Sequence, residues 1–458
     1  MRVLILAHDY PPVGGGGVQR VLHLVRSLHA SDHAVHVVTV DQEPGPMRDD
    51  SLLERHPREV PITRYRLPSL RPVVDMFRAA HLSRIPTLVM PTDLYPDASI
   101  FAGTTARAAL EVARTFRPDV VVASAPPFGI IEAARRVGHR LGVTFVADLR
   151  DPWIEPVVAR FPSLASFHWA RALQRRCLRT ADLVTVTARS LQALLETLPV
   201  ARPRRVVTIT NGFDGEIPIS TSAMAEGREL CQHAQGARTV AFIGRLFTSD
   251  VKQSVRGGVL ANRLFDGLSV GREIVRADEY HAGPWFQALA LLARRRPDLR
   301  GKIETIFVGN VPRQGDSVPE AVNAFPTRFL GYRSLAVAAA VARAADALLL
   351  LNPSTVDDSP SFIIPGKLFE YVAAGPPILT MCGPGDCADI VRATGTGVWV
   401  HDYRPEEMTD HLERWLDGRG LPVARHESSI AGYERSALGR RFVAEIERAV
   451  KERRSDLR

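Results

Sequence analysis

The feature that most constrains the fold is a repeated alternation of short apolar runs with segments of helical spacing. In the first half of the chain, apolar runs rich in Val, Ile and Leu occupy residues 3–7, 35–40, 120–124, 143–148 and 183–186. Continuous apolar runs of this length are typical of parallel strands covered by helices on both faces. This half is therefore predicted to form a doubly wound α/β sheet.

A second set of runs follows, which begins near residues 206–209 and ends at 398–400. A chain of 458 residues is long for one hydrophobic core. The short link at 199–203, bracketed by two prolines, is the expected boundary. The expected division is into a domain at 1–200, a domain at 206–430 and a C-terminal helical segment at 431–458.

The charged residues indicate which classes of binding partner this chain can have. The net charge of +8 comes almost wholly from arginine. The lysines are Lys252, Lys302, Lys367 and Lys451. The sequence has no block of like charges and none of the aromatic interleaving that a nucleic-acid groove needs. We therefore expect no nucleic-acid partner, although a basic face suits a diphosphate or anionic lipid.

The cysteines and the N-terminal sequence indicate whether the chain binds a metal and where in the cell it is located. Cys177, Cys231, Cys382 and Cys387 lack metal-ligand spacing and a matching histidine cluster. The first apolar run is too short for a signal peptide or a membrane span. The sequence thus predicts a reduced, cytoplasmic protein with no metal site.

The stretch I-P-G-K-L-F-E-Y-V-A-A-G-P-P-I-L-T at 364–380 joins a Pro-Gly turn, a short helix and a strand. Lys367 opens the predicted helix, and Glu370 lies one turn further on. A carboxylate in this position, behind a glycine loop with free backbone amides, suits a ribose and its phosphates. The alternative is an ordinary turn with Glu370 on a solvated face.

A glycine-rich loop, D-Y-P-P-V-G-G-G-G-V-Q-R, follows the first strand at 9–20. Glycines ahead of a helix let backbone amides approach a diphosphate. A dinucleotide fingerprint would place its glycines directly after the strand. Here they come late, although Asp41 supplies the expected acid, so a nicotinamide enzyme is the weaker alternative.

Charged residues also follow a strand at A-D-L-R-D-P-W, residues 147–153. Asp148, Arg150 and Asp151 are candidate catalytic residues, because a carboxylate at a strand end can orient or deprotonate an acceptor hydroxyl. The alternative is a structural Asp–Arg pair that fixes the loop.

Together these motifs resemble glycosyltransferase family 4, whose C-terminal domain carries a K-L-F-E-Y-x-A-A-G-x-P-I run and whose first loop reads P-P-x-x-G-G. The resemblance covers most of the chain, except residues 43–101 and 247–284. It implies a GT-B architecture, with two Rossmann-like domains facing across a cleft and a last helix that crosses back to the first domain. It further implies retaining transfer from a nucleotide-diphosphate sugar, with no cofactor besides that co-substrate.

The resemblance also implies the donor-binding residues. In F-I-G-R-L at 242–246, Arg245 would contact the diphosphate, and Lys252 lies further along than the family spacing. The donor-binding candidates are Gly15, Gly16, Gly17, Arg245, Lys252, Gly309, Asn310, Tyr332, Gly366, Lys367, Leu368 and Glu370. Many family members carry a second acid before this helix. Phe362 occupies that position here, which leaves the donor sugar open.

The expected activity is glycosyl transfer to a hydroxyl of a saccharide, lipid-linked or small-molecule acceptor, in bacterial polysaccharide, glycolipid or specialised-metabolite glycoside synthesis. The alternatives are a nucleotide-sugar epimerase or hydrolase on the same fold, and an inactive GT-B partner subunit, which Phe362 favours. Residues 247–284 are expected to border the cleft and to move on ligand binding. Arginines between 64 and 84 flank Val74, Phe77 and Leu82, which predicts peripheral contact with an anionic membrane.

Overall fold

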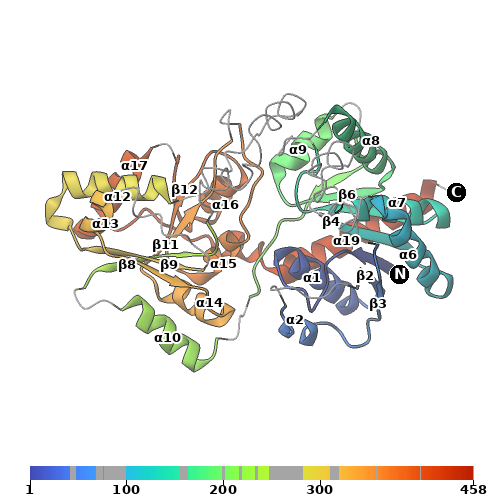
Figure 1. Ribbon diagram of the computed structural model, residues 1–458, viewed down its shortest axis with the longest axis horizontal. Coiled ribbons are helices and arrows are strands. Elements are labelled where there is room, and N and C mark those ends of the chain that lie inside the picture. The colour runs from blue at the N-terminus through green and yellow to red at the C-terminus, as the bar shows by residue number, and fades with distance from the viewer. Residues whose placement is uncertain are drawn as a thin grey trace. The chain divides into compact units, whose positions relative to one another are not determined.

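The computed structural model divides into two compact units, each described by itself (Figure 1). The first comprises Met1–Asn211 and Ser436–Arg458, and the second comprises Gly212–Gly257 and Ile274–Arg435. The structure describes residues 1–41, 48–68, 76, 100–154, 163–198, 202–215, 219–232, 236–246, 282–309, 319–355, 359–402 and 404–456.

The first unit is built on a parallel sheet in the order β3-β2-β1-β4-β5-β6-β7. Its strands are β1 (Arg2–Ala7), β2 (Ala34–Val40), β3 (Ile62–Tyr65), β4 (Val120–Ala125), β5 (Thr144–Leu149), β6 (Leu183–Val186) and β7 (Val206–Thr208). Its helices are α1 (Gly16–Ala30), α2 (Ser51–Glu54), α6 (Ala102–Phe116), α7 (Gly129–Leu141), α8 (Leu164–Thr180), α9 (Arg189–Thr197) and α19 (Arg435–Asp456), which begins on the last residue of the second unit. Strands β4 and β5 are buried along their whole length, as expected for central strands covered on both faces.

Strand β7 corrects the sequence-based division of the chain. The apolar run near 206–209 was expected to open the second domain. In the structure, Val206 pairs with Val184 of β6, so the run is the last strand of the first sheet. A three-residue strand carries no sequence signal of which sheet it joins, because pairing is decided by its neighbours in space.

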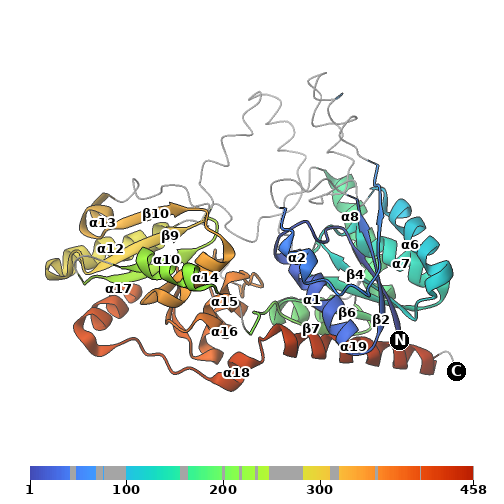
Figure 2. The ribbon, with the colours of Figure 1, turned by 90° about the horizontal axis from the view of Figure 1, so that it is seen from below.

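Helix α19 completes the core of the first unit (Figure 2). Phe442, Ile446 and Val450 pack in one cluster with Val3 of β1 and Leu28 of α1. A Cβ added at Gly439 would lie 2.0 Å from the hydroxyl of Ser27, so the glycine lets α19 approach α1 closely.

The second unit has a parallel sheet in the order β10-β9-β8-β11-β12-β13. Its strands are β8 (Arg238–Ile243), β9 (Ile303–Val308), β10 (Thr327–Gly331), β11 (Ala347–Leu351), β12 (Ile378–Met381) and β13 (Gly397–Val400). Its α-helices are α10 (Thr221–Cys231), α12 (Gly283–Arg295), α13 (Pro319–Ala324), α14 (Leu335–Ala344), α15 (Lys367–Ala374), α16 (Asp386–Thr394), α17 (Pro405–Arg414) and α18 (Glu427–Ala431). A 3-10 turn spans Pro297–Leu299 and a π turn spans Trp415–Arg419. Phe242 joins a core cluster around Trp285, and the adjacent Ala241 joins another around Tyr371, so the sheet is covered on both faces.

Two sequence-based expectations fall on segments that the structure describes little or not at all. The expected mobile insertion lies outside the described residues, apart from its last three. The basic segment between 64 and 84 is described only in part. Within it, Arg64 donates to the carbonyl of Pro11 at 2.5 Å, and Arg66 lies 3.8 Å from the carboxylate of Asp41. Among the described helices, none has the length and apolarity to cross a membrane.

Candidate functional site

Helix α15 carries the central candidates of the second unit. It begins at Lys367 after Gly366, which provides no side-chain cap. The amides of Leu368 and Phe369, in the first turn, donate to the carbonyls of Pro365 and Gly366 at 3.0 and 3.3 Å. The side chain of Leu368 is fully buried in the core, so this residue has only its backbone to offer a ligand.

Lys367 extends from α15 to the end of β8. Its Nζ atom lies 3.8 Å from the centroid of the Phe242 ring. A Cβ added at Gly244 would lie 2.8 Å from the same Nζ, and Gly244 has a φ of 133°, so both space and backbone conformation favour glycine there. Burial lowers the pKa of Lys367 to about 7. A nearby anion would therefore favour its protonated form.

The ends of three adjacent strands are tied together beside this lysine. The amide of Gly244 donates to the carbonyl of Val308 at 2.8 Å, and the amide of Gly309 donates to that of Gly331 at 2.8 Å. A Cβ added at Gly309 would overlap the carbonyl oxygen of Gly244 at 2.1 Å. The strand ends at β8, β9 and β10 thus lie close to one another at the carboxyl edge of the sheet, where α/β proteins bind ligands.

The candidates that follow these glycines are exposed. Arg245 is exposed directly after Gly244, and the Tyr332 side chain is 84% exposed directly after Gly331. Two other candidates, Lys252 and Asn310, lie outside the described residues.

Glu370 is partly buried and faces a cation. Arg435 donates to Glu370 Oε1 at 3.3 Å, and its other terminal nitrogen lies 3.0 Å from Asp214 Oδ2. Glu370 is therefore paired with Arg435, the last residue of the second unit. The alternative of a carboxylate that faces only solvent does not provide such a partner. Phe362, at the position of the first of the two family acids, is buried.

Tyr371 is a positioning residue that sequence reasoning missed. Its ring is 1% exposed, and its hydroxyl accepts a hydrogen bond from the amide of Ile243 at 2.7 Å. The bond joins α15 to the last residue of β8, immediately before Gly244 and Arg245. A buried tyrosine needs a partner for its hydroxyl, and this requirement is the one signal that the sequence offered.

In the first unit, Asp148 is buried, with 1% of its surface exposed. Arg20 contacts both carboxylate oxygens, at 2.7 and 2.9 Å, and Ser124 and Thr185 donate at 2.6 and 2.7 Å. Burial acts to raise the pKa of Asp148, but the charge of Arg20 and these hydrogen bonds hold it below its usual range. This geometry favours the structural alternative, with Arg20 as the partner, over a role at the acceptor.

Arg20 was also missed by sequence reasoning, although it closes the glycine-rich motif. Besides Asp148, it donates to the carbonyl of Thr210 at 3.2 Å and to Asn211 Oδ1 at 3.4 Å. Its guanidinium lies 5.5 Å from the centroid of the Phe442 ring of α19. Arg20 thus joins α1, β5, the segment after β7 and the C-terminal helix within one unit.

The glycine loop lies over Arg150. A Cβ added at Gly17 would lie 2.8 Å from the guanidinium carbon of Arg150, whose nitrogens donate to Ser124 at 3.2 Å and to the carbonyl of Pro126. Gly15 has a φ of 117° and caps α1 without a side-chain bond, and the first turn beginning at Gly16 holds no acidic residue. Asp151, next to Arg150, is exposed. Of the two carboxylates in this motif, Asp148 is buried and Asp151 is exposed, and partial desolvation raises the pKa of Asp151 above its usual range.

Residues 15–212 match the family model described as the glycosyl transferase 4-like domain. A search of curated proteins found no match.

Solved structures resemble the whole chain, beyond the residues that the family model matches. HepE from Anabaena, in complex with UDP and glucose, is 13% identical, with a TM-score of 0.57 over 98% of this chain and 99% of that one. Sucrose-phosphate synthase from Thermosynechococcus elongatus is 14% identical, with a TM-score of 0.59 over 98% and 99%. An Escherichia coli trehalose-6-phosphate protein bound with UDP-2-fluoro glucose is 14% identical, with a TM-score of 0.54 over 100% and 99%. These likenesses confirm the expected GT-B architecture of two Rossmann-like domains.

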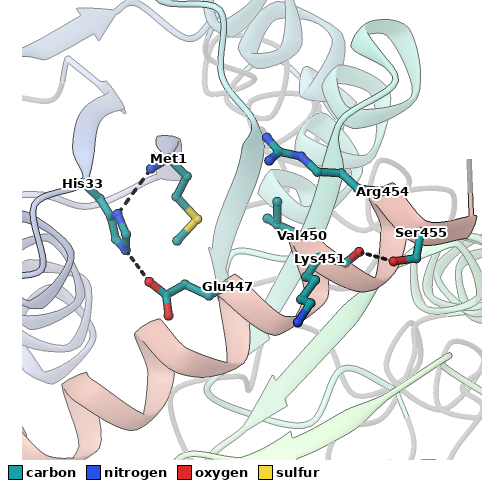
Figure 3. A pocket seen from close by; sticks show the side chains of 7 residues that line it. All are labelled: Met1, His33, Glu447, Val450, Lys451, Arg454 and Ser455. Carbon is teal, nitrogen blue, oxygen red and sulfur yellow. Dashed lines mark hydrogen bonds and ion pairs between the residues drawn. The ribbon is translucent and has the colours of Figure 1, made fainter. Parts of the chain in front are cut away.

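A pocket in the first unit lies at the opposite edge of its sheet (Figure 3). Its lining residues are Met1, His33, Glu447, Val450, Lys451, Arg454 and Ser455. His33 joins the N-terminal amine, at 3.4 Å, to Glu447, at 3.0 Å. Because Met1 and His33 precede β1 and β2, the pocket lies at the amino ends of the strands, away from the glycine loop.

Within the described ranges, no group of three or more His, Cys, Asp or Glu side chains is placed to hold a metal ion.

Proposed function

We propose that the protein is a glycosyltransferase that moves a sugar from a nucleotide-diphosphate sugar to an acceptor hydroxyl. The observation that carries the proposal is the convergence of α15 with the ends of β8, β9 and β10 at the carboxyl edge of the second unit's sheet. This edge presents a carboxylate, a lysine whose Nζ is buried, an exposed arginine and an exposed tyrosine. This combination of groups suits a ribose, a diphosphate and a base.

Each group has a proposed role toward the donor. Glu370 accepts hydrogen bonds from the ribose hydroxyls. Lys367 and Arg245 stabilise the charge that develops on the departing diphosphate. Tyr332 offers an aromatic face to the base. UDP and UDP-glucose are the first ligands to test, because similar folds were solved with UDP, glucose and UDP-2-fluoro glucose.

The first unit is proposed to provide the acceptor side. Asp151 is the accessible carboxylate that orients or deprotonates the acceptor hydroxyl. Arg150 holds the loop in place through Ser124 and Pro126. The uncapped start of α1, at Gly15, Gly16 and Gly17, offers amides to an anionic group.

The finer features of the reaction are part of the proposal. We infer retention of configuration, a hexosyl donor, no cofactor besides the nucleotide sugar, and no required metal. We place the reaction in the cytoplasm, in bacterial polysaccharide, glycolipid or specialised-metabolite glycoside synthesis.

Thermal-shift measurements with nucleoside diphosphates and their sugars test the donor site. A ligand at about 100 times its dissociation constant adds roughly 2.7 kcal/mol of stability. Mass spectrometry of a reaction with a panel of hydroxyl acceptors then distinguishes a transferase, which forms a glycoside, from a hydrolase or epimerase, which does not. If no nucleoside diphosphate raises the melting temperature, the proposal is wrong.

A further inference from the structure

Helix α8 presents an unusual outer face. It follows the β5 loop in the first unit and is drawn in green in Figure 1. Its buried side, which includes Leu173, Cys177 and Leu178, faces the protein. Leu164, at 60% exposed, and Trp169, at 44%, lie on the opposite side. The other exposed residues of the helix are Ala165, His168, Ala172, Arg176, Arg179 and Thr180.

The exposed face changes character along the helix axis. The first three turns expose Leu164, Ala165, Trp169 and Ala172, with His168 as the only polar side chain among them. The last two turns carry Arg175, Arg176 and Arg179. Trp169 and Arg176 are seven residues apart, which corresponds to about 10 Å along a helix.

The charge of this face has one sign. Helix α8 contains no acidic residue. The acid beneath it, Glu132 of α7, is buried and shared by Arg135, Arg136 and Arg176, so positive charge remains in excess around it.

We propose that the outer face of α8 docks the first unit on an anionic lipid surface. Apolar side chains at the amino end of the helix enter the boundary between headgroups and acyl chains, which lies about 5–10 Å deep. The arginines one to two turns further along then lie at the level of the phosphate headgroups, where their charge is attracted. The site differs from the basic segment at 64–84, and the proposal does not depend on the glycosyl-transfer proposal.

The chain offers a matched control for this proposal. Leu164 is the first residue of α8, after Ser163, whose hydroxyl accepts from the amide of Ser166 at 3.1 Å. Leu335 is the first residue of α14 in the second unit, after Ser334, whose hydroxyl accepts from the amide of Val337 at 3.3 Å. Leu335 is 59% exposed, so a glutamate at either position meets the same local structure and exposure.

Flotation with vesicles of phosphatidylcholine, with and without phosphatidylglycerol, tests the proposal. The full chain should float with the anionic vesicles, and Leu164→Glu should weaken binding at least about tenfold, which corresponds to 1.4 kcal/mol. Leu335→Glu should float like the wild type. The double variant Arg175→Glu/Arg179→Glu should lose binding, and raised salt should weaken it in the wild type.

Three results would overturn the proposal: absence of wild-type flotation, equal flotation with the neutral vesicles, and equal effects of the two leucine variants. Thermal melts of both leucine variants show whether each is folded. If Leu164→Glu is unfolded, the arginine double variant decides, because its substitutions lie on the exposed and half-buried positions of the last turns.

Discussion

Replacement of Glu370 by alanine is the sharpest test of the donor site. Charge-assisted hydrogen bonds contribute about 1.5–3 kcal/mol each, so loss of the ribose contact should weaken UDP binding roughly 10- to 150-fold. UDP and UDP-glucose should lose affinity by the same factor, because the contact is to the ribose and not to the sugar. Isothermal titration calorimetry measures both dissociation constants. Glu370→Gln, which keeps one acceptor oxygen, should fall between alanine and the wild type.

Arg435 provides the control that separates binding from structure. The Arg435–Glu370 pair spans 3.3 Å, and the glutamate side chain is 33% exposed, so its loss should change the free energy of unfolding by about 0–1 kcal/mol. If Glu370 serves the ribose, Arg435→Gln should leave the affinity for UDP within about threefold of wild type, which is roughly 0.6 kcal/mol. If Glu370 only holds Arg435 in place, both variants should weaken UDP equally. Normal UDP binding by Glu370→Ala would refute the assignment outright.

Four further predictions concern the stability of the fold and the metal dependence of the reaction. Burial lowers the pKa of Lys367 from 10.5 to about 7. Between pH 7 and pH 10.5 this lysine is therefore protonated in the unfolded chain and deprotonated in the folded chain. The free energy of unfolding should rise with pH across this range, because the unfolded state binds more protons. Urea denaturation should show that this rise is smaller in Lys367→Met. Asp148→Asn leaves Arg20 buried without its counter-charge and should cost about 3–5 kcal/mol in the same assay, whereas an exposed acid would cost almost nothing. Gly309→Ala, where a Cβ meets a carbonyl oxygen at 2.1 Å, should lower the melting temperature more than Gly301→Ala, where nothing lies within 4 Å; equal shifts would contradict the close approach. Transfer should persist in excess chelator, and loss that manganese or magnesium restores would contradict a metal-independent reaction.

The strands and the GT-B architecture could be predicted from the sequence because continuous apolar runs mark buried parallel strands. The run expected at 35–40 falls within β2 (Ala34–Val40). The environment of the site residues could not be predicted in the same way. Asp148 lies near the end of β5, and Asp151 follows the same strand. Asp148 is nevertheless paired with Arg20, which lies 128 residues away in sequence. The assignment of β7 failed for the same reason, since a partner strand is chosen by packing that the local sequence does not record.

The packing of α19 also has a consequence for biosynthesis. The residues that cover β1 and α1 are among the last of these 458 to be made, so the first unit cannot close its core while the second is being translated. A nascent chain that ends before residue 436 leaves Leu28 and its apolar neighbours without Phe442, Ile446 and Val450. Such exposed apolar surface favours aggregation and chaperone binding. Truncation within α19 should therefore reduce the yield of soluble protein, although α19 contains none of the candidate site residues.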